Sequence, residues 1–179
     1  MKSSATDIVI QEFEAATKET FEYHSPDDVE FESIGVEVAS DYLNSQVDPD
    51  AEMFSSSIGL DGDELSSSIA LLGAADTIQA ACRVNIDSPR DWIGELANLL
   101  MGALKTKLTE YRVESRLGLP VSVRGKQLDF ITTDAIERVA QCVRTPKGII
   151  IVVLHFAVKR GVEWERAAEK QATDDVCLF

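Results

Sequence analysis

The sequence is poor in the residues that build metal centres and disulfide frameworks. Its 179 residues include two histidines, His24 and His155, and three cysteines, Cys82, Cys142 and Cys177. The cysteines are odd in number, far apart and never in a C-x-x-C pattern, which argues against a disulfide framework or a zinc site and favours a reducing compartment. We therefore expect a cytoplasmic protein with no metal ligands of its own.

Basic residues and long apolar runs are also scarce. Seventeen basic residues stand against 31 acidic ones, a formal net charge of −14, so no basic stripe is available to neutralise phosphates of a nucleic acid or an anionic membrane. Residues 1–21 mix acidic side chains into the apolar ones, unlike a signal peptide, and the longest apolar run, 148–158, is too short to span a bilayer. Neither nucleic acid nor membrane is an expected partner.

Two common enzyme signatures are missing. The serine triplets at 55–57 and 66–68 lie outside any G-x-S-x-G elbow, and the glycines nearby form neither G-x-G-x-x-G nor a P-loop. His155 lies in the apolar run IIVVLHFAV, which is typical of a strand histidine with a structural role. The sequence thus offers no hydrolase triad and no nucleotide site.

The length and the 45% hydrophobic content fit one folded domain. We expect this domain to occupy residues 1–160, followed by a polar, acidic tail at 161–179. In the first half, apolar periodicity predicts a helix over 7–23 with Thr6 as N-cap, one or two strands over 29–40 and a loop over 44–50. A serine-rich hairpin follows, whose turn is Asp61-Gly62, a dipeptide suited to positive φ angles.

The second half repeats this order. A short helix is predicted over 74–82, and Ser88-Pro89 begins a long helix that runs to about residue 112, with Ser88 as N-cap and Pro89 at the first position. Extended segments at 119–123 and 126–132 and a hairpin of 136–144 with 149–159 follow. The predicted fold is α+β, a mainly antiparallel sheet packed against long helices, with pseudo-symmetric helix-strand-hairpin halves.

The long helix carries the most informative pattern, Asp91, Glu95, Asn98 and Gly102, spaced D-x3-E-x2-N-x3-G. Steps of four, three and four residues keep these side chains within a stripe roughly 60° wide on one side of a helix. The opposite side is apolar and should be buried, leaving a carboxylate and a carboxamide exposed to a partner. We call these four residues the polar stripe.

A solvated surface helix explains part of this stripe equally well. Asp91, three positions after the Ser88 cap, fits a capping role through its bond to the cap and the helix dipole. Asn98 and Gly102 are harder to explain this way because both are poor helix formers, glycine by roughly 1 kcal/mol relative to alanine. A glycine here would allow a partner to approach the helix closely.

The helix also resembles the signature helix of the CheC/CheX/FliY family of chemotaxis phosphatases, which displays a Glu and an Asn three residues apart. The match extends through GELANLLMGALKTKL, where the polar pair is Glu95 and Asn98. The hairpin IGLDGDELSSSIAL, the segment LGLPVSVRGK and the last hairpin resemble the family's elements in the same order, so the resemblance covers about residues 10–158. The other long helix has only Glu14-Ala15-Ala16-Thr17, so the chain looks like a single-site, CheX-like member.

The resemblance implies a phosphatase, hence a hydrolase, that acts on a CheY-like response regulator phosphorylated on aspartate. Glu95 would pair with the regulator's active-site lysine, and Asn98 would orient the attacking water. Asp91, Gly102 and Lys105 would contact the partner. The regulator would bring Mg²⁺, so no cofactor is expected in this chain, and the family suggests a homodimer formed by sheet edges.

A non-catalytic role is the alternative. Serines replace some of the family's glycines in the first hairpin, and the tail is acidic. These departures leave room for a module that binds a response regulator without dephosphorylating it, or for a component of the flagellar switch of the FliY kind.

Overall fold

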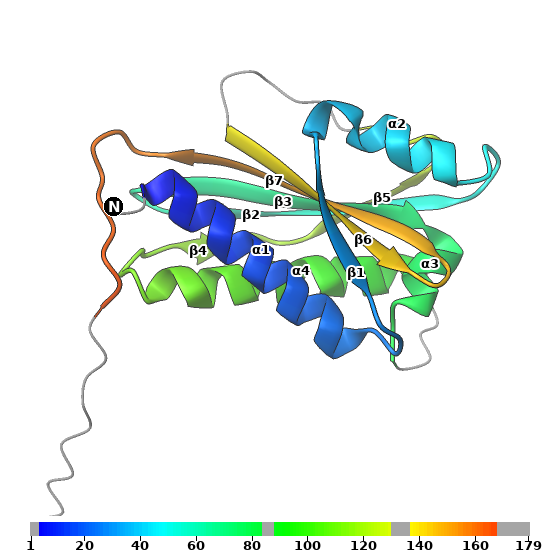
Figure 1. The fold of residues 1–179 in the computed structure, drawn as a ribbon, viewed down its shortest axis with the longest axis horizontal. Helices are drawn as coiled ribbons and strands as arrows, with labels where there is room; N and C mark the ends of the chain where they lie inside the picture. The colour runs from blue at the N-terminus through cyan, green and yellow to red at the C-terminus, as the bar shows by residue number, and fades with distance from the viewer. Residues whose placement is uncertain (1–3, 84–87, 130–136, 168–179) are drawn as a thin grey trace, which may run out of the picture.

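The computed structural model describes residues 4–83, 88–129 and 137–167. Within these residues, seven strands form an antiparallel sheet in the order β1-β6-β7-β3-β2-β4, with β5 also paired to β2. Helices α1 and α4 lie on one face of the sheet and α2 on the other (Figure 1). The predicted α+β class with long helices against an antiparallel sheet is confirmed.

The helices and strands follow the predicted order with two additions, α2 and the two-residue strand β4. The helices are α1 (Ala5–His24), α2 (Val36–Gln46), α3 (Ala75–Ala80) and α4 (Pro89–Thr109). The strands are β1 (Glu30–Ile34), β2 (Met53–Asp61), β3 (Leu65–Ala74), β4 (Arg116–Leu117), β5 (Val121–Gly125), β6 (Glu137–Thr145) and β7 (Gly148–Val158).

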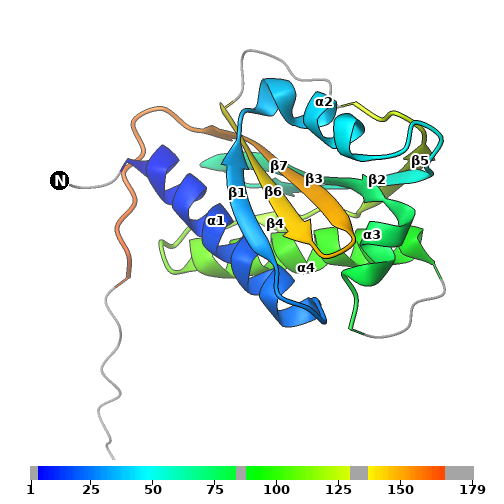
Figure 2. The same cartoon turned by 45° about the vertical axis from the view of Figure 1, so that its right-hand side comes forward.

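The two halves of the chain complete each other's sheet. In each half a long helix is followed by one or two short strands and then by a hairpin, β2–β3 or β6–β7, with α2 inserted before the hairpin of the first half. The strand after α1 pairs with the second hairpin, and the strands after α4 pair with the first. The hairpins meet at β3 and β7 in the middle of the sheet, as Figure 2 shows. This exchange is the pseudo-symmetry that the order of elements predicts.

The main core lies between the sheet and the two long helices. The apolar side predicted for α4 is completely buried, at Ile93, Leu96, Ala97, Leu100, Met101 and Leu104. Phe13 and Phe21 of α1 are equally buried in the same cluster. Burying one such side chain contributes roughly 1.5–3 kcal/mol, so the core holds α4 with its polar stripe turned outward.

Helix α2 corrects the prediction of strands over 29–40 and of a loop from residue 44. Strand β1 ends at Ile34, and the alternating GVEVAS segment is helical instead. Val36, Ala39 and Leu43 follow helical spacing and are buried against the second face of the sheet, whereas Val38 is exposed. Contact with the sheet overrides the β preference of the valines.

The first hairpin is present, but its glycine has a different role from the one expected. Residues 62–64 connect the strands, and Gly62 is not among the positive-φ glycines of the described chain, which are Gly148 and Gly161. A Cβ at Gly62 would lie 2.2 Å from the carbonyl oxygen of Glu114. The glycine is therefore required by close approach of a neighbouring backbone.

The chain continues to pack beyond β7. Trp164 is buried, and its Nε1 donates a hydrogen bond of 2.9 Å to Glu64. The amide of Ala167 donates to the carbonyl of Glu110 just after α4, at 2.7 Å. The prediction of an extended segment over 126–132 is wrong at residues 126–129, which follow the end of β5 and belong to no strand. Residues 130–132 and the tail from residue 168 lie outside the described residues. Across the described ranges, no helix is both long and apolar enough to cross a membrane.

Candidate functional site

The start of α4 fixes where the polar stripe begins. Ser88 is the N-cap with an extended backbone, its hydroxyl accepts a hydrogen bond from the Asp91 amide at 3.3 Å, and Pro89 follows as predicted. In α1, by contrast, the N-cap is Ser4 rather than Thr6, and the Asp7 carboxylate completes a capping box with it. In α4 the cap hydrogen bond comes from the backbone of Asp91, and Asp91 is also one of the residues that line the surface described next.

Glu95 and Asn98 are both exposed, one turn apart on the outer side of α4. Neither side chain has a hydrogen bond or an ion pair to any other residue that the structure describes. A carboxylate and a carboxamide that are exposed and uncommitted remain available to a partner molecule. The predicted exposure of this pair is confirmed.

The pair lines an open hollow of about 420 Å³ between α4 and the strands beside it. Its α4 side is Arg90, Asp91, Gly94, Glu95 and Asn98, and its strand side is Gly118, Leu119, Pro120 and Ser122. Gly94 makes this approach possible, because a Cβ there would lie 3.2 Å from the Ser122 hydroxyl. We call this surface the α4 hollow.

The strand side of the α4 hollow is not predicted from the sequence. Ser122 is held by a 3.1 Å hydrogen bond between its hydroxyl and that of Ser56, and Leu119 is 86% exposed. The flanking Gly118 and Pro120 mark a turn in the sequence, but a turn alone does not reveal which helix it faces. That information requires the register of β4 and β5 on β2.

Gly102 and Lys105 continue the polar stripe beyond the residues that line the α4 hollow. Gly102 is half-buried, and no described atom outside its own helix surroundings lies within 4 Å of the position its Cβ would take. The packing of the described chain therefore does not require a glycine there. Lys105 is half-buried one turn further along.

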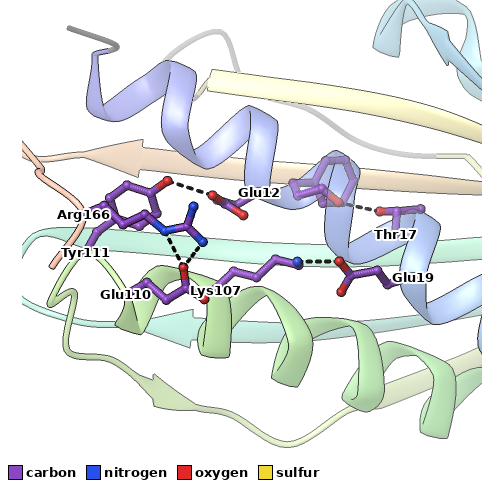
Figure 3. Close-up of polar contacts among 8 residues, drawn as sticks. Glu12, Thr17, Glu19, Lys107, Glu110, Tyr111 and Arg166 are labelled. Carbon is purple, nitrogen blue, oxygen red and sulfur yellow. Dashed lines mark hydrogen bonds and ion pairs between the residues drawn. The ribbon is translucent and has the colours of Figure 1, made fainter. Parts of the chain in front are cut away.

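Helix α1 does not present a second pair. Thr17 is completely buried, and its hydroxyl donates to the carbonyl of Phe13 at 2.9 Å (Figure 3). The Glu14 carboxylate accepts a hydrogen bond from Ser33 of β1 at 3.4 Å. Glu14 and Thr17 thus differ from the pair on α4 in two ways, because position 17 is a threonine and because its side chain is buried.

Packing between the two helices fixes their relative position. Lys107 of α4 contacts Glu19 of α1 at 2.7 Å, and the hydroxyl of Tyr111 donates to Glu12 at 2.8 Å. Burial, followed by this bond to Glu12, raises the pKa of Tyr111. Figure 3 shows these contacts at the end of α4 remote from the α4 hollow, where Arg166 also pairs with Glu110.

The serines, the histidine and the tryptophan that the sequence offers as other candidates belong to the sheet or to the edge of the core. The serine triplets lie on β2 and β3. His155 lies on β7, where burial, followed by the charge of Arg138, lowers its pKa; its Nε2 is buried without a hydrogen-bond partner among the described residues. Trp92 packs at the edge of the main core, 5.8 Å from His24 between ring centroids. Within the described ranges, no group of three or more metal-ligating side chains occurs.

Comparisons with known proteins identify the fold. No sequence-family model and no curated protein match the chain. Among solved structures, the chemotaxis protein CheX from Vibrio vulnificus has a TM-score of 0.65 at 15% identity, covering 83% of this chain and 99% of that one. A CheC-like superfamily protein from Shewanella sp. PV-4 has a TM-score of 0.63 at 16% identity, covering 84% and 97%.

A third solved structure is a complex of CheX with CheY, BeF₃ and Mg²⁺ from Borrelia burgdorferi. The similarity to this chain has a TM-score of 0.61 at 15% identity, covering 83% of this chain and 97% of that one. The chain thus has the fold of CheC/CheX-like chemotaxis proteins over most of its length. At these identities the comparison establishes the fold, and the activity must be argued from the site.

Proposed function

We propose that this chain is a CheX-like phosphatase that hydrolyses the aspartyl phosphate of a CheY-type response regulator. The observation that carries the proposal is the exposed, uncommitted pair Glu95 and Asn98 on α4, in a chain with the CheC/CheX-like fold. The solved assembly of CheX with CheY supports the choice of partner.

The proposed reaction needs little covalent help from the enzyme. Water forms a bond to phosphorus, the bond from phosphorus to the aspartate oxygen breaks, and the products are a carboxylate, inorganic phosphate and a proton. The aspartate carboxylate is a good leaving group, so the main task is to place the water in line with the phosphorus–oxygen bond that breaks. Mg²⁺ on the regulator would neutralise the phosphoryl oxygens, and this chain needs no cofactor of its own.

Asn98 is the proposed water-orienting residue. A carboxamide both donates and accepts hydrogen bonds and does not titrate, so it can hold a water molecule at any working pH. A contribution of about 100-fold in rate corresponds to about 2.7 kcal/mol of transition-state stabilisation, a reasonable value for one positioning contact.

Glu95 is the proposed docking residue, paired with the active-site lysine of the regulator. An exposed ion pair contributes about 0–1 kcal/mol, but one that docking removes from water contributes more to orientation and specificity. Asp91, Gly102 and Lys105 lie on the same side of α4 and would extend the contact.

The proposal includes a cytoplasmic location, where a response regulator would be met, and a homodimer formed by sheet edges. In the described chain, β1 forms one edge of the sheet, and β4 and β5 form the other. A sedimentation experiment on the purified protein measures the oligomeric state directly.

The test is to incubate the chain with phosphorylated response regulators from the same genome and to follow phosphate loss and complex formation separately. Accelerated loss from at least one regulator is the expected result. Binding without acceleration would instead identify the non-catalytic module. Neither binding nor acceleration with any regulator of the genome would contradict both functions.

A further inference from the structure

The connection between β4 and β5 contains one residue more than the strand it faces. Leu117 pairs with Leu60 and Val121 pairs with Ser57. Three residues, 118–120, therefore lie opposite only two, 58 and 59. An extra residue of this kind is a β-bulge, which occurs at sheet edges and beside active sites and redirects a side chain.

A hydrogen bond at Gly118 and the fixed φ angle of Pro120 limit the conformations of the bulge. The Gly118 amide donates to the carbonyl of Gly59 at 2.8 Å, and a Cβ at Gly118 would lie 3.4 Å from that same carbonyl oxygen. Pro120 has a fixed φ angle and no N–H to leave unpaired. The bulge is thus a short, constrained segment, and the residue at its centre is displayed in a defined position.

That central residue is a leucine with most of its surface in water. Leu119 is 86% exposed, more than any other large hydrophobic side chain in the described part of the protein. It lines the α4 hollow together with Glu95 and Asn98. A rigidly displayed apolar side chain beside polar residues is typical of the anchor of a protein interface, because little entropy is lost when it is buried.

We infer that Leu119 is the apolar anchor by which the receiver domain of the phosphorylated regulator docks on the α4 hollow. The inference rests on the proposed function and adds a docking residue that the polar stripe does not contain. A receiver domain whose phosphorylation site faces Glu95 and Asn98 must also cover the bulge, since all three residues line one hollow. The partner should therefore carry an apolar patch next to its phosphorylated aspartate.

The test compares Leu119→Ala and Leu119→Asp with the control Val38→Ala. Val38 is also an exposed apolar residue, at 54%, but it lies on α2, on the face of the sheet opposite α4. The conservative variant Leu119→Met keeps an apolar side chain. Circular dichroism verifies that each variant is folded. We expect all of them to fold, because the substituted side chains are exposed.

Binding is measured by titrating a receiver domain that carries BeF₃⁻ and Mg²⁺. Leu119→Ala should weaken the affinity about tenfold and Leu119→Asp more, while Leu119→Met and Val38→Ala stay close to the wild type. In turnover with the phosphorylated regulator, the loss should be found in KM, whereas the loss from Asn98→Ala should be found in kcat.

Each other outcome is distinct. Unchanged affinity of Leu119→Asp, with a wild type that binds and dephosphorylates the regulator, overturns the anchor and leaves the proposed function intact. A shift of Leu119→Asp from dimer to monomer at unchanged affinity for the regulator assigns the bulge to self-association and also overturns the anchor. A wild type that binds no regulator overturns the inference and the proposed function together.

Discussion

Helices α1 and α4 occupy equivalent places in the two halves of the chain, yet only α4 displays a polar pair. They are 20 and 21 residues long, both begin with a serine N-cap, and both lie on the same face of the sheet. Each contains a glutamate followed three residues later by a hydrogen-bonding side chain. In α4 that side chain, Asn98, is exposed, whereas in α1 it is Thr17, which is completely buried.

The difference shows that two residues with the right spacing form a site only when the helix exposes both of their side chains. Thr17 is buried with the neighbouring Ala16, Thr20 and Phe21, so this part of α1 faces the core. Its hydroxyl is satisfied inside the helix by Phe13. A completely buried hydroxyl, with its one proton already donated inside the helix, is out of reach of a water molecule on a partner.

The largest expected effect is the loss of dephosphorylation in a protein whose E-x-x-N motif is moved from α4 to α1. Thr17→Asn creates the motif E-x-x-N on α1, and we expect it to restore nothing to an Asn98→Ala protein, whose dephosphorylation should remain about 100-fold below the wild type. Phosphate release by the double and single variants measures this. A double variant much faster than Asn98→Ala would show that position 17 can reach a regulator, and the comparison of the helices would fail.

Thr17→Asn should also destabilise the protein. The larger amide would be placed in a packed interior with its polar atoms incompletely paired, which costs about 1–3 kcal/mol. Urea denaturation of the single variant gives the free energy of unfolding. The control is Asn44→Ala on the opposite face of the sheet, at a half-buried position of α2. A stability equal to that of the wild type would mean that α1 has room at this site.

The glutamates of the two helices, Glu95 and Glu14, should also differ in their importance for regulator binding, with a smaller effect. Glu95→Ala should weaken regulator binding about tenfold, a loss of about 1.4 kcal/mol, and lower phosphate loss with it. Glu14→Ala removes a carboxylate that contacts Ser33 of this chain and should leave binding unchanged. Titration of one regulator into both variants makes the comparison, and equal losses would remove the distinction between the helices.

Gly102→Ala gives the smallest expected changes, an increase in stability and a decrease in affinity for the regulator. Alanine should stabilise α4 by up to about 1 kcal/mol, because no described atom occupies the space of its Cβ. If a partner packs there, the same methyl group should weaken binding a few-fold. Unfolding and binding measured on one preparation test both signs. A more stable protein with unchanged affinity would leave Gly102 without a role in docking.

Local signals account for the elements that the sequence predicts well. Ser88 and Pro89 specify the start of α4, and the period of its apolar residues specifies which side is buried. The exposure of Glu95 and Asn98 therefore follows from the sequence alone. The last hairpin is equally clear, since Pro146 and Lys147 alone connect β6 and β7.

The features that the sequence does not predict depend on contacts between distant segments. The alternation of Val36 and Val38 with polar residues favours a strand, and only the sheet beneath α2 shows that Val36 is buried and Val38 exposed. The role of Gly62 depends on the backbone of Glu114. The bulge at Leu119 depends on the number of residues in β2 that it faces, which is a property of the register.

The most direct test of the central claim is the rate of phosphate loss from one regulator at saturating concentrations of the wild type, Asn98→Ala and the control Asn44→Ala, with binding measured on the same proteins. The account predicts that Asn98→Ala binds like the wild type but loses about 99% of the acceleration, equivalent to about 100-fold, while the control loses none. Undiminished phosphate loss with Asn98→Ala would contradict the assignment of Asn98 as the residue that orients the attacking water.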